Sequence, residues 1–151
     1  MLRFALAALA VATCATPAFS QVTVKDPWVR ATVPEQKSSG AFMQLTSPTD
    51  VRLVAVRSKV AGIAEIHEMK MEGNVMKMAA VPGIAIPAGK TVALTPGGYH
   101  VMLMDLKQQL KDGDTVPITL VVEDKDKKMQ TIEVDAPVRQ LGATGASGHK
   151  H

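Results

Sequence analysis

The chain has 151 residues, with 17 basic and 14 acidic side chains and a formal net charge of +3. So small an excess of positive charge argues against nucleic acid as the partner, because nucleic-acid-binding proteins cluster Lys and Arg on one surface. Cysteine occurs once, at Cys14, whereas methionine occurs nine times.

The N-terminus is typical of a secretory signal peptide. A positive start containing Arg3 precedes an apolar run from Phe4 to Ala12, and the following residues are small or polar up to Ser20. The apolar run has about half of the ~20 residues needed to cross a membrane, so we expect cleavage after Ser20. A lipoprotein signal is an alternative, since the residues before Cys14 loosely resemble a lipobox, although the preceding threonine fits poorly. We therefore expect export to the periplasm.

Removal of residues 1–20 would leave 131 residues, enough for one domain with its own core. We place this domain at residues 21–138 and expect a monomer without a membrane span. Because Arg3 is the only charged residue removed, 16 basic and 14 acidic residues remain, which is a formal charge of +2. The mature chain would contain no cysteine, and therefore no disulfide and no functional thiol.

Short alternating runs separated by turn residues dominate the mature chain, which is typical of an all-β domain. The run Val51 to Arg57 alternates most cleanly and places Val51, Leu53 and Ala55 on one face. The only helical candidate is a single turn within residues 104–110. We expect eight or nine strands, and hence a β-sandwich or a Greek-key barrel. The ten runs from which these eight or nine strands would be drawn are residues 22–25, 28–33, 40–47, 51–57, 64–71, 75–81, 91–95, 99–104, 115–123 and 129–134.

The composition changes after Pro137 to mainly Gly, Ala, Ser and Thr, which cannot bury a core. We therefore expect residues 139–151 to form a flexible tail. Its final histidines, His149 and His151, could hold a second metal ion, Cu(II), although a solvated chain end is the simpler interpretation.

Two stretches repeat the same spacing of a histidine and a methionine, His67-Glu68-Met69 and His100-Val101-Met102. They contain the only histidines before the last three residues of the chain. Imidazole and thioether without a thiolate form a ligand set that suits Cu(I). Six of the nine methionines lie close to these histidines in sequence: Met69, Met71, Met76, Met78, Met102 and Met104.

The hairpin formed by residues 64–81 is predicted to gather thioethers on one face. Side chains two residues apart on a strand share a face, so His67, Met69 and Met71 point the same way. If Gly73-Asn74 is a two-residue turn, the partner strand adds two more methionines to this face. The predicted cross-strand pairs are Met71 with Met76 and Met69 with Met78.

The second hairpin offers a similar face, because His100, Met102 and Met104 also alternate along one strand. Packing the two faces together would form a pocket of imidazoles and thioethers. One detail counts against the register of the first hairpin, since it sets Lys70 opposite Lys77. A three-residue turn would instead move the methionines of the partner strand to the other face.

Core packing is the alternative role for methionine, because its flexible thioether fills irregular gaps. We interpret Met43 and Met129, which lie apart from the others, as ordinary core residues.

The spacing of four residues resembles the motif of the periplasmic copper chaperone family PCu(A)C. Ten residues separate His67 from Met78, twenty-one separate Met78 from His100, and Met102 follows after one more. The resemblance extends from about Trp28 to Val134. It includes the segments around the motif, namely residues 73–78, Ile86-Pro87-Ala88-Gly89 and Pro96-Gly97-Gly98.

This resemblance implies a cupredoxin-like β-sandwich that holds one Cu(I), with His67, Met78, His100 and Met102 as ligands. It also implies that the protein carries copper to an acceptor. The expected acceptor is the dicopper centre in subunit II of cytochrome c oxidase or a Sco-type thiol protein.

Other classes of function fit the sequence less well. Blue-copper electron transfer needs a cysteine thiolate with two histidines, which the mature chain lacks. We do not expect an enzyme, because no paired carboxylates, no nucleophile with its base and no water-activating metal set are apparent. Sequestration of Cu(I) without a specific acceptor would use the same residues and stays open. So does a generic exported domain that binds a partner through its methionines.

Overall fold

The computed structural model describes residues 22–141, which form ten strands and no helix. Among these residues there is accordingly no helix of the length and apolarity needed to cross a membrane. The predicted signal peptide at residues 1–20, with Cys14, lies outside the described residues, as do His149 and His151 of the predicted tail. The ten strands are β1 (Thr23–Arg30), β2 (Ser38–Thr46), β3 (Val51–Arg57), β4 (Ala61–Glu72), β5 (Val75–Ala80), β6 (Ile84–Ile86), β7 (Thr91–Leu94), β8 (Tyr99–Leu106), β9 (Thr115–Asp124) and β10 (Met129–Arg139).

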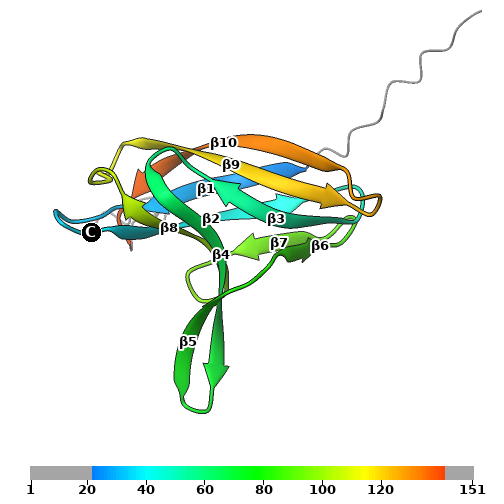
Figure 1. Cartoon of the computed structure of the whole chain (residues 1–151), viewed down its shortest axis with the longest axis horizontal. Coiled ribbons are helices and arrows are strands. Elements are labelled where there is room, and N and C mark those ends of the chain that lie inside the picture. The colour runs from blue at the N-terminus through cyan, green and yellow to red at the C-terminus, as the bar shows by residue number, and fades with distance from the viewer. Residues whose placement is uncertain (1–21, 142–151) are drawn as a thin grey trace, which may run out of the picture.

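The strands form two layers, which confirms the prediction of an all-β sandwich (Figure 1). One layer has the order β5-β4-β8-β2-β1, with β7 paired to the second half of β2. The other has the order β10-β9-β3-β6. The layers are continuous where the end of β1 pairs in parallel with the end of β10, at Val29 with Val138 and Arg30 with Arg139.

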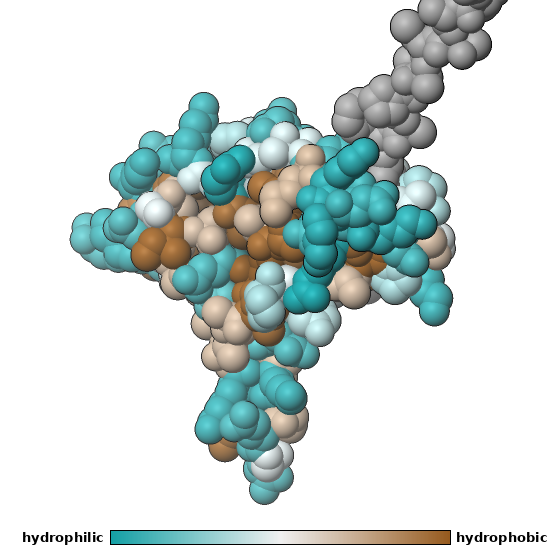
Figure 2. All heavy atoms as spheres, turned by 45° about the vertical axis from the view of Figure 1, so that its right-hand side comes forward, coloured by the Kyte–Doolittle hydropathy of each residue, from teal (hydrophilic) through white to brown (hydrophobic). Residues whose placement is uncertain are grey.

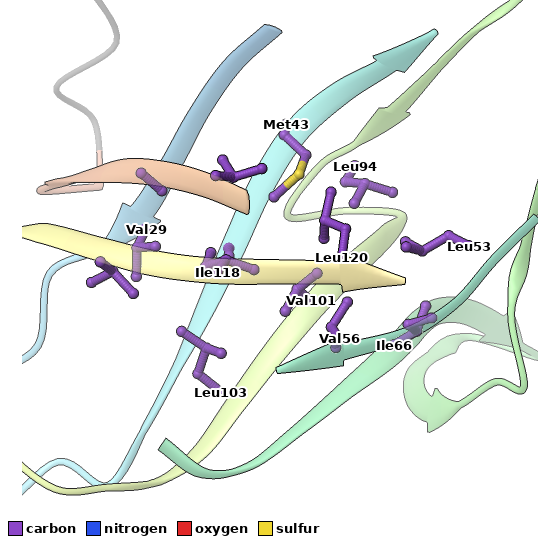
Figure 3. Close-up of a cluster of buried hydrophobic side chains, with 14 of the residues drawn as sticks. Val29, Met43, Leu53, Val56, Ile66, Leu94, Val101, Leu103, Ile118 and Leu120 are labelled. Carbon is purple, nitrogen blue, oxygen red and sulfur yellow. The ribbon is translucent and has the colours of Figure 1, made fainter. Parts of the chain in front are cut away.

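The core lies between the layers and is built from alternate residues of their strands (Figure 3). Val101 and Leu103 of β8 are fully buried and face Ile118 and Leu120 of β9 across this core. Because successive side chains of a strand point to opposite faces, His100, Met102 and Met104 of β8 lie on the outer face of the layer. This alternation places His100 outside the main core.

Two strand assignments differ from the sequence prediction. The predicted break at Asp26-Pro27 is a bulge inside the continuous strand β1, where Asp26 has a φ of 49°. A second bulge lies between Leu53 and Ala55 of β3. It shifts the alternation by one residue, so Val56 enters the core and Ala55 is exposed.

Three smaller expectations are also corrected. The short strand β6 was not predicted, because three residues carry too little alternation to be recognised. The helical turn expected within residues 104–110 is absent, since β8 continues to Leu106. Met129 is 65% exposed rather than buried, whereas Met43 is a core residue as predicted.

Candidate metal centre

The two histidines meet on neighbouring strands of one layer. His67 of β4 and His100 of β8 are direct cross-strand partners, and their ring centroids are 5.9 Å apart. Both side chains are nearly buried, with residue exposures of 7% and 5%. The expectation that two separate faces pack together is therefore wrong, because β4 and β8 pair laterally and share one face.

Each imidazole has one nitrogen committed to a hydrogen bond. Nδ1 of His100 donates to the carbonyl oxygen of Gly98 at 3.1 Å, because a carbonyl can only accept. Nε2 of His67 donates to the carboxylate of Glu65 at 2.7 Å. Metal-binding histidines are usually oriented in this way, with one N–H held by a carbonyl or carboxylate and the other nitrogen facing the ion.

The second nitrogen of His67 has an environment that fits a metal ligand. Its Nδ1 is buried and has no hydrogen-bond partner. With the hydrogen on Nε2, this atom presents a bare lone pair, and a buried acceptor left unpaired is costly to the fold. A soft cation is a partner that would satisfy it. His100 offers the equivalent lone pair at Nε2.

A row of aromatic rings closes one side of the histidine pair. Phe42 of β2 lies 6.3 Å from the ring of His100, and Trp28 of β1 lies 4.6 Å from Phe42, measured between ring centroids. A Cβ on Gly40 would come within 2.7 Å of the Phe42 ring, so the glycine leaves the room that this ring occupies. Apolar walls of this kind limit the access of water to a site.

Met102 lies beside the histidines on the same face. It is two residues after His100 on β8, pairs with Glu65 of β4 on one side and with Gly40 of β2 on the other, and is partly buried. The structure thus places His67, His100 and Met102 on one face of the adjacent strands β4 and β8.

Met78 lies further out, on the projecting end of the β4–β5 hairpin. We refer to residues 69–78 as the arm, which extends away from the sandwich in Figure 1. Met78 pairs with Met69 and is 46% exposed. Met78 on β5 is two strands away from Met102 on β8, and its partner Met69 lies four residues along β4 from Glu65, the partner of Met102. On a flat sheet these steps would separate the Cα atoms of Met78 and Met102 by roughly 16 Å. Both side chains can therefore reach one ion only if the arm bends.

The register of the arm matches the prediction from the two-residue turn. Met71 pairs with Met76 and Met69 pairs with Met78. Only the first turn residue, Gly73, has a positive φ, of 60°, as a type II′ turn requires. Lys70 does oppose Lys77, but Glu72 lies 3.0 Å from the Lys77 ammonium and offsets the repulsion.

Comparisons with known proteins agree with this architecture. A sequence profile described as "Putative lipoprotein LpqE-like" matches residues 22–138. The chain belongs to the LpqE-like, or PCu(A)C, family. A relative from Leifsonia xyli subsp. xyli, described as "Putative lipoprotein Lxx21020", is 33% identical over 121 residues, which are 80% of this chain and 70% of that protein.

Solved structures of this family share the fold. The apo PCu(A)C domain of PmoF1 superposes with a TM-score of 0.64 at 27% identity, over 79% of this chain and 93% of that domain. The Cu(I) form of DR1885 from Deinococcus radiodurans gives a TM-score of 0.63 at 35% identity, over 82% of this chain and 83% of that protein. The structural neighbours are thus copper-binding, cupredoxin-like PCu(A)C domains.

Sequence reasoning missed the residues that orient the histidines. Glu65 precedes His67 by two residues and therefore shares its face, which is a detectable signal. No sequence pattern predicted the row of aromatic rings, because Trp28 and Phe42 come from strands that are far from His100 in the chain.

Proposed function

We propose that this protein is an exported carrier of Cu(I), which it binds through His67, Met78, His100 and Met102. The observation that carries the proposal is the buried, unpartnered Nδ1 of His67 on the strand position opposite His100. The Cu(I)-bound relative at 35% identity supports the choice of metal. Imidazole and thioether are neutral ligands, which favour the monovalent ion.

The arrangement suits delivery better than permanent storage. Met78 is 46% exposed on the arm, so a partner can approach the ion from that side and replace one ligand at a time. The histidines, by contrast, are held by Glu65 and Gly98 and would stay in place during exchange. We infer transfer to an acceptor, of which the dicopper centre of cytochrome c oxidase or a Sco-type thiol protein is the expected one, and no enzymatic reaction.

An anaerobic competition for Cu(I) against a chromogenic chelator tests the site. We expect one tightly bound Cu(I) per chain in the parent, and weaker binding in His67→Ala, Met78→Leu, His100→Ala and Met102→Leu. Met129→Leu is a matched control, since Met129 is also exposed but lies on β10. Parent-like affinity in all four site variants would overturn the proposal.

Sequestration of Cu(I) without a specific acceptor is the alternative function. The two functions differ in what happens when the Cu(I)-loaded protein meets an apo acceptor domain. Delivery predicts transfer faster than release to a chelator of equal affinity, because ligand exchange proceeds within a complex. Equal rates would favour sequestration.

The family description as lipoproteins makes the route of export testable. We propose cleavage after Ser20 and release into the periplasm. Intact-mass analysis of the exported protein should show Gln21 as the first residue. A lipid-modified Cys14 at the N-terminus would show instead that the protein is anchored.

Binding of Cu(II) by His149 and His151, the less favoured interpretation of the tail, would use none of the residues of the carrier site. Truncation after Leu141 should remove Cu(II) binding and leave Cu(I) binding unchanged. A truncated protein that still binds Cu(II) would exclude the tail as the site.

A further inference from the structure

The arm separates its thioethers from its charges. Met69 and Met71 of β4 and Met76 and Met78 of β5 share one face, since they are cross-strand partners in two neighbouring pairs. Four charged residues of the β4–β5 hairpin lie on the opposite face: Glu68, Lys70, Glu72 and Lys77. The methionine face therefore consists of neutral, soft donors.

Core packing does not explain these methionines. Met71 is 61% and Met76 is 46% exposed, and every residue of β5 is exposed. Figure 2 shows the arm standing out into solvent, with its visible side mostly hydrophilic. Met43, at 2% exposure, illustrates the packed alternative. A thioether fills gaps only where neighbours surround it, and the exposed Met71 and Met76 lack such neighbours. Met69, at the base of the arm, is half-buried.

The spacing of the outer thioethers allows three of them to reach one ion. Met71 and Met76 are direct partners, and the Cβ atoms of such a pair are about 4.5–5.5 Å apart. Met69 is two residues from Met71 on the same face and diagonal to Met76. Long, flexible side chains can converge from these positions, and soft thioethers select Cu(I).

We propose that Met69, Met71 and Met76 form a second Cu(I) site at the end of the arm. None of these residues is among the four ligands of the proposed carrier site, so the two sites can be tested separately. The arm site is open to solvent, whereas the histidine pair is buried, and it is therefore the weaker and faster-exchanging of the two. Met78, a ligand of the carrier site, is the direct cross-strand partner of Met69, so it lies beside the arm site on the same face.

Methyl resonances of ¹³C-labelled methionine provide the test. Cu(I) is added anaerobically, as its acetonitrile complex, to the full chain. We expect the first equivalent to shift Met78 and Met102, the methionine ligands of the carrier site. Further equivalents should produce an additional shift of Met69, Met71 and Met76. The methyls of Met129 and Met43 stay unmoved and serve as internal controls for exposed and buried methionine.

Two variants decide the assignment. Met71→Leu with Met76→Leu keeps the apolar bulk, and should lose the additional bound Cu(I) while the shift of Met102 is retained. His100→Ala with Met102→Leu should lose the first site and keep the shifts of the arm.

Three results would overturn the second site. They are unmoved arm methyls at excess Cu(I), an unchanged number of bound ions in the double-leucine variant, or loss of the arm response in the variant without the carrier site. If only the carrier site is wrong, the methyl resonances of the arm should shift with Cu(I) while the resonance of Met102 does not.

Discussion

Binding of copper at the proposed centre depends on which nitrogen of each imidazole is free to coordinate the ion. Glu65 holds Nε2 of His67 and the carbonyl of Gly98 holds Nδ1 of His100, so each ring is fixed in one orientation. A ring that is oriented before the ion arrives loses less conformational freedom on binding. We therefore propose that Glu65 is a positioning residue rather than a ligand.

Replacement of Glu65 tests this role. Glu65→Ala removes the acceptor for Nε2 and should weaken Cu(I) binding by about 10–100-fold, the usual effect of losing a partner of a metal-binding histidine. Glu65→Gln retains an oxygen acceptor and should lose less. The measurement is the same chelator competition, with Glu68→Ala, on the opposite face of β4, as control. Equal affinity in Glu65→Ala and Glu68→Ala would exclude the positioning role.

A second residue-scale prediction concerns the aromatic wall. Gly40→Ala places a methyl 2.7 Å from Cζ of Phe42 and forces the ring to move against its neighbours. Overpacking of this kind costs about 1–3 kcal/mol in the free energy of unfolding. Gly97→Ala is the control, because a Cβ there meets nothing within 4 Å. Chemical denaturation of both variants measures the difference in the free energy of unfolding. Equal values would show that the Phe42 ring can move without loss of packing.

The β4–β5 hairpin is the element that separates Met78 from the other three residues of the motif. Its tip is held by the two-residue turn at Gly73, and β5 pairs only with β4 along the arm. Two-stranded hairpins are only marginally stable alone, so the arm can bend toward the sheet at low cost. Closure of the arm over the histidine pair follows from the proposed ligand set.

Arm closure is measurable as a change in distance. Spin labels at Asn74, in the turn of the arm, and at the exposed Arg57 of β3 should report a shorter separation when one equivalent of Cu(I) is bound. Met78→Leu should abolish the shortening, because the arm then lacks its ligand. A Cu(I)-loaded parent with the same distance as the apo protein would mean that Met78 does not join the histidines.

The sequence predicted where the strands lie in the chain better than it predicted which strands pair with each other. Alternation located most of the strands, and the two-residue turn at Gly73 predicted the register of the arm correctly. The lateral pairing of β4 with β8 was not predictable, because it joins strands that are distant in the chain. The same limit hid the bulge at Leu53, which depends on β9, and the aromatic row beside His100.

The two-layer sandwich, at the scale of the whole molecule, supports the centre from beneath. Strand β8 contributes Val101 and Leu103 to the core and His100 and Met102 to the outer face. Packing of its inner residues therefore fixes the position of the outer ones. The core and the proposed metal site share strand β8, so the stability of the fold and the binding of Cu(I) should be coupled through this strand.

Leu103→Ala tests this coupling. Leu103 is fully buried, so its truncation should lower the free energy of unfolding by about 2–5 kcal/mol. Binding of Cu(I) to the folded state should recover part of this loss by mass action. Thermal unfolding of apo and Cu(I)-loaded protein measures both effects. A melting temperature that does not respond to Cu(I) would show that the ion is bound outside the folded centre.

X-ray absorption at the copper K edge of the anaerobically loaded protein measures the coordination of the ion directly. With one equivalent of Cu(I), we predict a first shell of two nitrogen and two sulfur neighbours. His100→Ala should lose one nitrogen and Met102→Leu should lose one sulfur. A first shell of oxygen and nitrogen alone, or one that neither substitution changes, would contradict the assignment of copper to this histidine and methionine centre.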